Sequence, residues 1–215
     1  MVEAFNSGYK LIPRELSWNF LVKLDADLSF DADYFEKCIR HFRVDPTLGI
    51  GGGTVMQRIG GGAIIDSPGD PPFHVRGATK IYRRPCWEAI APLAAGPGWD
   101  TIDEVKANCV GWRTRTLTDA QVVQLKPTGD ADGSWRNWYK NGRANFLTGY
   151  HPVFMVAKCM KRAVRRPLLR EGLALWLGYC SGYREGLVPL ADTATVKYLR
   201  NQQFRRLLLR PSIYG

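Results

Sequence analysis

The stretch NFLVKLDADLSFDADYFEKCIRHFRVDPTLGIGGG, residues 19–53, decides which fold the sequence favours. It opens with an apolar run at 19–24, broken by Lys23 and followed by two acids, which is typical of a buried parallel strand ending in polar groups. Apolar residues then recur at helical spacing over 34–42, and 50–56 is strand-like although three glycines weaken it. These patterns predict a strand, an acidic turn, a helix and a second strand.

The rest of the chain continues this alternation. Two further strands and two further helices are expected, at 80–84, 113–117, 85–90 and 99–110. Alternating strands and helices indicate the α/β class, with a mixed sheet flanked by helices. Beyond residue 127 the sequence becomes aromatic and basic, which we interpret as a helical tail. The predicted division is a sheet domain at 1–128 and a basic helical extension at 129–215.

Composition restricts the partners and the compartment. Thirty Lys and Arg against twenty Asp and Glu give 215 residues a formal charge of +10, which favours anionic partners without choosing among them. The five cysteines are scattered and form no CxxC pair, so we expect no disulfide framework or zinc knuckle, and a cytoplasmic setting. Neither 1–10 nor the apolar run at 173–180 predicts a signal peptide or a membrane span.

The acids that follow the first strand are the first candidate site. Two carboxylates at i and i+2, Asp25 and Asp27, can share one Mg²⁺ or Mn²⁺, because these ions prefer oxygen ligands together with substrate phosphates. The alternative is that they are turn and capping residues, like Asp31 and Asp33. On the three-residue motif alone the alternative is favoured, because such short motifs recur by chance.

A longer match changes that balance. The stretch from Val22 to Gly53 resembles the metal-binding core of bacterial family 2 glycosyltransferases, which have a Rossmann-like GT-A fold. The resemblance implies that Asp27 binds the divalent ion directly, with Asp25 as its partner, in contact with a nucleotide-diphosphate sugar. It also implies UDP as the leaving nucleotide and a metal that neutralises the departing diphosphate.

Two further blocks extend the resemblance. RGATKIYRRPCWEAI, residues 76–90, is similar to the family's acceptor-side segment, in which Gly77 and Ala78 would leave room for a sugar. GPGWDTIDEVKAN, residues 96–108, resembles the acidic motif that supplies the catalytic base, and Asp103 stands at the matching carboxylate. Many members have Glu-Asp there, whereas this chain has Ile102 before the aspartate.

Inverting transfer needs one base to take the proton from the acceptor hydroxyl. Glu104 and Asp100 are the substitutes for Asp103 in that role. Trp99 could stack on an acceptor sugar, although it could equally be a packing anchor. Residues 125–152 resemble a loop that closes over the site in bacterial members, which makes Arg136 a candidate for contact with the diphosphate. The implied acceptor is a glycan or a lipid-linked hydroxyl.

The resemblance covers only part of the family domain. Only 24 residues precede Asp25, whereas a βαβ unit for nucleotide binding takes roughly 30 residues or more. We therefore expect a fragment that is truncated at the N-terminus, lacks the front of the nucleotide site and exposes a sheet edge.

Two other functions fit the charge. In a metal-dependent nuclease or phosphotransferase, Asp25, Asp27 and Asp103 would hold the metal, but the sequence has no helix-turn-helix, RNP or zinc pattern, so no specific nucleic acid is expected. In a non-catalytic membrane-surface module, the basic segment 153–166 and the arginines near 205–210 would contact anionic lipid, peripherally at the inner face of the plasma membrane. A solvated basic helix face is the simpler explanation of the same residues.

Overall fold

The computed structural model describes residues 1–13, 15–59, 62–66, 68–126, 133–164 and 168–215. The chain forms two compact units, unit 1 at 1–93 and 103–127 and unit 2 at 94–102 and 128–215. A division at residue 128 was expected from the change in composition. The sequence carries no comparable change at 94–102, the stretch by which unit 2 interrupts unit 1.

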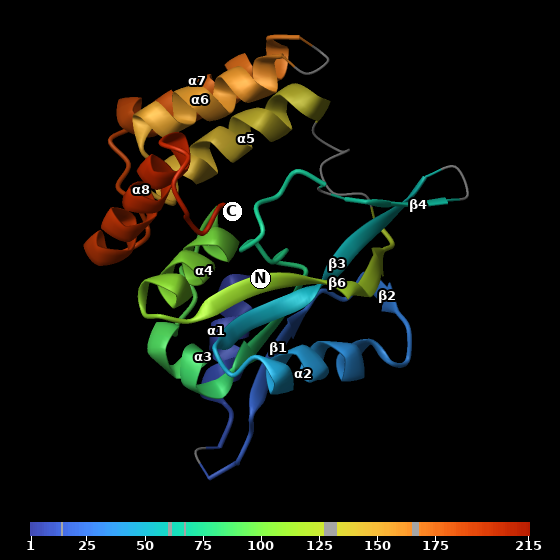
Figure 1. Cartoon of the computed structure of the whole chain (residues 1–215). Helices are drawn as coiled ribbons and strands as arrows, with labels where there is room; N and C mark the ends of the chain where they lie inside the picture. Colours follow the sequence, from blue (N-terminus) through green and yellow to red (C-terminus); the bar gives the residue numbers. More distant parts are fainter. Residues whose placement is uncertain (14, 60–61, 67, 127–132, 165–167) are drawn as a thin grey trace. The chain divides into compact units, whose positions relative to one another are not determined.

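Unit 1 is built on a mixed sheet with helices beside it (Figure 1). Its elements are α1 (Val2–Lys10), β1 (Phe20–Leu24), β2 (Leu28–Phe30), α2 (Tyr34–Val44), β3 (Leu48–Ile59), β4 (Gly62–Ile65), β5 (Thr79–Arg83), α3 (Arg84–Ile90), α4 (Trp99–Cys109) and β6 (Arg113–Gln124). The strand order is β1-β5-β3-β6-β2, with β4 paired to β3. Strands β3 and β6 are parallel, and the other pairs are antiparallel. The expectation of a mixed α/β sheet flanked by helices is confirmed.

Two details of the opening stretch were predicted wrongly. Strand β1 is not a buried parallel strand, because it stands at one end of the strand order and pairs antiparallel with β5. The acidic turn does not lead straight into the helix either, since β2 follows it and pairs with β6. Three residues of strand are too few for an alternating pattern to be recognised in the sequence.

The core of the sheet lies under α2. Tyr34, Cys38 and Phe42 follow one another at four-residue spacing and pack on buried residues of β3, β5 and β6. The glycines of β3 permit this packing. A Cβ atom on Gly52 would lie 2.0 Å from the carbonyl oxygen of Thr79, and one on Gly53 would lie 2.6 Å from Cε2 of Tyr34. Two of the three glycines that weaken the strand in the sequence pattern, Gly52 and Gly53, are therefore required by close contacts.

Unit 2 contains the helices α5 (Gly133–Leu147), α6 (Pro152–Ala163), α7 (Arg170–Arg184) and α8 (Thr193–Leu207). Helices α5 and α7 approach closely at two glycines, since a Cβ on Gly142 would lie 2.0 Å from the oxygen of Leu175, and one on Gly178 would lie 2.0 Å from that of Tyr139. Buried Glu171 of α7 pairs with Arg162 of α6 and accepts a hydrogen bond from Ser134. The helical character was expected, but the helices form a compact unit and not a tail. Within the described residues, no helix has the length and hydropathy needed to span a membrane.

Candidate functional site

Two buried lysines mark the candidate site in unit 1. In the antiparallel pair of β1 and β5, Lys23 lies opposite Lys80, and opposite residues of such a pair project from the same face. Lys23 is 4% exposed and Lys80 is 0% exposed. Because lysine is almost never buried unless it is paired, the groups that neutralise these two ammonium groups define the site.

Lys23 joins the acidic turn to the small-residue turn. Its Nζ forms an ion pair with Asp25 and donates a hydrogen bond to the carbonyl oxygen of Gly77. The backbone N–H of Asp25 donates to the carbonyl oxygen of Ala78 at 2.9 Å. Three residues selected from separate sequence blocks, Asp25, Gly77 and Ala78, therefore lie together.

Asp27 stands in the same turn, just before β2. Its carbonyl oxygen accepts a hydrogen bond from the backbone N–H of Leu125 at 2.8 Å. Its side chain is partly exposed and forms no ion pair with a described residue, unlike that of Asp25. The described part of the chain contains no group of three metal-ligating side chains. Two carboxylate groups in one turn fit a hard divalent ion only if substrate oxygens and water supply its other ligands.

Lys80 holds the other two acids. Its Nζ lies 2.8 Å from Oδ1 of Asp103 and 2.7 Å from Oε1 of Glu104, and all three side chains are buried. The hydroxyl of Tyr82 donates to Oδ2 of Asp103 at 2.6 Å. The ring of His74 reaches Oε2 of Glu104 at 2.9 Å. Every carboxylate oxygen of Asp103 and Glu104 has at least one protein partner.

Burial dominates the chemistry of Asp103. The pKa of this carboxyl is raised to about 7, first by desolvation and then by the charge of Glu104, while Lys80 and Tyr82 oppose the shift. Asp103 is 3% exposed and both its oxygens are bonded. The residue expected to be the base thus has a suitable pKa. Its two oxygens are bonded to Lys80 and Tyr82, so one of these partners would have to be replaced by the acceptor hydroxyl.

The raised pKa predicts a pH dependence of stability. A folded chain keeps this proton up to a pH of about 7, whereas an unfolded aspartate loses it near pH ~3.9. The native state therefore binds more protons between these values, so this group's contribution to stability falls as the pH rises through that window. Asp103→Asn is expected to remove this decline, measured as the free energy of urea unfolding across the window. Parallel profiles for the native chain and the variant would contradict it.

The remaining candidates belong to unit 2. Trp99 and Asp100 form the first turn of α4, whose later residues belong to unit 1, and Arg136 lies in α5. Part of the segment expected to close over the site, 127–132, falls outside the described residues. The lysines, Tyr82 and His74 were not identified from the sequence. The available signal was a lysine inside each of two apolar strands, Lys23 in FLVKL and Lys80 in TKIYR.

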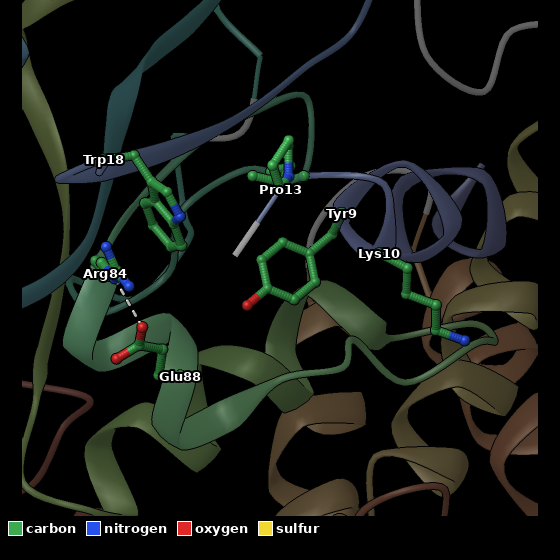
Figure 2. Close-up of a pocket in the computed structure, with 7 residues that line it drawn as sticks. Tyr9, Lys10, Pro13, Trp18, Arg84 and Glu88 are labelled. Carbon is green, nitrogen blue, oxygen red and sulfur yellow. Dashed lines mark hydrogen bonds and ion pairs between the residues drawn. The ribbon is translucent and has the colours of Figure 1, made fainter. Parts of the chain in front are cut away.

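A separate concavity lies at the other end of β1 and β5 (Figure 2). It has a volume of about 560 Å³ and is lined by Tyr9, Lys10, Ile12, Pro13, Trp18, Arg84 and Glu88. The Arg84 guanidinium lies 5.0 Å from the centre of the Trp18 ring and donates to Glu88 at 2.7 Å. The acid in this lining is thus already paired with arginine. The concavity offers no pair of carboxylates for a metal and is not the candidate metal site.

No protein-family model and no curated protein matches the sequence. Among solved structures, the chain is similar to the mannosyltransferase PcManGT from Pyrobaculum calidifontis in complex with GDP-Man and Mn²⁺, with 16% identity and a TM-score of 0.48. The match covers 99% of this chain and 55% of that one, so the chain spans about half the length of this protein. Similarity at this level does not assign the chain to a family.

Proposed function

We propose that the chain carries the metal-diphosphate site of a glycosyltransferase that uses a nucleotide-diphosphate sugar. The observation that carries the proposal is the junction of the acidic turn with the turn at Gly77 and Ala78 through buried Lys23. This junction brings together, from non-adjacent stretches, residues that the resemblance to family 2 glycosyltransferases assigns to one site. Short acidic turns that only cap a helix need no buried lysine.

The two aspartates have different roles in this proposal. Asp27, which has no ion pair with a described residue, is the direct ligand of Mg²⁺ or Mn²⁺, and Asp25 is oriented beside it by Lys23. A bound ion would supply charge neutralisation for the departing diphosphate. UDP is the proposed nucleotide because the resemblance implies it. Arg136 is the proposed side-chain contact to the diphosphate.

The proposed transfer inverts the anomeric configuration of the sugar and uses Asp103 as the base. A base works best with a pKa near the operating pH, which the raised pKa of Asp103, about 7, satisfies. Exchange of its Tyr82 bond for an acceptor hydroxyl would let it take the proton. Glu104 and Asp100 remain the substitutes for this role.

The acceptor is a glycan or a lipid-linked hydroxyl. The turn at Gly77 and Ala78 would leave room for its sugar, and Trp99 is the proposed stacking partner. A cytoplasmic location also remains a proposal, and the five cysteines are free thiols in the structure.

The nuclease or phosphotransferase alternative fits less well. It needs Asp103 to join Asp25 and Asp27 around one metal. Instead, Asp103 is bonded to Lys80 and Tyr82, and no set of three metal-ligating side chains occurs in the described residues.

Calorimetric titration tests the proposed site. UDP, and GDP in parallel, would be titrated into the native chain with Mn²⁺ and again with EDTA. Saturable binding that requires the metal is expected, because the two carboxylates need phosphate oxygens to complete the coordination of the ion. Absence of binding to a chain whose circular dichroism shows it to be folded would overturn the proposal.

A further inference from the structure

Helix α6 exposes a continuous apolar stripe. Its members are the large aliphatic residues Val153, Val156, Met160 and Val164, which are 44% to 74% exposed. They follow one another at spacings of three, four and four residues, so they lie on one face of the helix and its C-terminal cap. The buried residues Met155 and Cys159 lie on another face of the helix, roughly a third of a turn away.

Helix α7 has a second stripe. Leu169, Leu173 and Leu177 stand four residues apart at its N-cap and along its length, and they are 43% to 70% exposed. Exposed aliphatic side chains scattered singly are ordinary on a protein surface, but aligned series of them mark interaction sites.

The two stripes lie on the same side of the α6–α7 pair. A Cβ on Gly172 would lie 2.7 Å from the oxygen of Cys159, and Glu171 pairs with Arg162. Contacts that advance along one helix while they retreat along the other show that the helices are antiparallel. At about 100° per residue, the stripe on each helix lies roughly a third of a turn from the side that contacts the other helix. Viewed from the N-terminus of each helix, this rotation has the same sense in both. Because the helices are antiparallel, the two stripes therefore lie on the same side of the pair. We call these seven aliphatic residues the α6–α7 face.

The charges near this face are almost all positive. Helix α6 contains no acid. Of its basic residues, Lys158 donates to Asn145 and Arg162 pairs with Glu171, whereas Lys161 is exposed. Helix α7 has an arginine at each end, Arg170 and Arg184, and its one acid is Glu171, which is buried against Arg162. An apolar stripe beside lysine and arginine is the composition of helices that lie in a membrane interface.

Aromatic residues along α7 add to this character. Tyr183 in the last turn of α7 is exposed and packs on Phe146, and partly exposed Trp176 lies between two of the leucines in sequence. Both residue types favour the boundary between lipid headgroups and acyl chains.

We propose that the α6–α7 face docks on an anionic lipid bilayer. The aliphatic side chains enter the boundary between headgroups and acyl chains, and Lys161 and Arg170 contact lipid phosphates. The helices lie in the plane of the surface, because 12 and 15 residues are fewer than the ~20 that span a bilayer. This surface does not include the arginines near 205–210. Arg205 and Arg206 donate hydrogen bonds to backbone oxygens of the C-terminal segment.

Vesicle co-sedimentation of the full chain tests the docking. Vesicles of phosphatidylcholine alone would be compared with vesicles containing phosphatidylserine, for the native chain and for the double variant Met160→Glu with Leu173→Glu. Binding to the anionic vesicles is expected, with a loss of at least about tenfold in the variant, because both substitutions place acids on the face. Both residues are exposed, so the fold should be unaffected.

Val110→Glu is the matched control, since it places the same acid at an exposed aliphatic residue of unit 1. It should bind anionic vesicles like the native chain. The proposal is overturned if the native chain does not sediment with anionic vesicles, or if the double variant binds as well as the control. It is also overturned if the face instead mediates self-association, seen as a dimer in sedimentation velocity that the double variant abolishes while no vesicle binding occurs.

Discussion

Lys80→Met is expected to lower the free energy of unfolding by about 3–5 kcal/mol, because it removes the cation from a buried ionic group. The Lys80 ammonium contacts both Asp103 and Glu104, and all three side chains are buried. Methionine has nearly the volume of lysine but leaves the two carboxylates without a cation. Urea unfolding of the native chain and the variant at neutral pH measures the loss.

Lys37→Met is the control for this experiment. Lys37 pairs with Asp33 on the surface of α2, so its replacement should leave the unfolding free energy nearly unchanged. The deficit of the Lys80 variant should also shrink as the pH is lowered, because protonated carboxyls need no cation. Equal effects of the two substitutions would show that Lys80 does not neutralise the buried acids.

Asp27→Asn is expected to weaken the metal-dependent binding of nucleotide diphosphate by about 100-fold or more, since it removes a charged ligand of the proposed ion. Amide and carboxylate have nearly the same shape, and Asp27 forms no ion pair with a described residue, so the unfolding free energy should stay close to that of the native chain. Calorimetric titration with UDP and Mn²⁺ measures the affinity.

Asp31→Asn provides the comparison, because Asp31 is an exposed acid of the same segment outside the turn. It should leave the affinity within about twofold, as expected for a surface charge a few residues away. If both variants bind nucleotide as the native chain does, the acidic turn is structural. If both lose it equally, the effect is one of general charge.

The positions of β1, α2 and β3 around the acidic turn could be predicted, but β2 and the pairing of the strands could not. Local periodicity located β1 and α2, whereas the assignment of β1 as a parallel strand depended on a remote partner. That partner is β5, more than 50 residues away, and the pair is antiparallel. Hydrophobic pattern reports which residues are apolar and does not report which strand lies beside which.

The acids of the candidate site could be selected from the sequence, but the lysines that pair with them were missed. Asp25, Asp103 and Glu104 were selected from motif-like patterns, and the structure gives each of them a lysine partner. Lys23 was interpreted as an interruption of an apolar run, although burial of a lysine in such a run indicates a nearby acid. Glu171 of α7 was missed for a related reason, because its burial against Arg162 depends on how the helices pack.

Release of nucleotide diphosphate from UDP- and GDP-sugars by the native chain, measured with Mn²⁺ and with EDTA, is the direct test of the proposed metal-diphosphate site. We expect release that requires Mn²⁺ and is lost in Asp27→Asn. Release that persists in EDTA, or that Asp27→Asn leaves unchanged, would contradict the assignment of the acidic turn as the metal-diphosphate site.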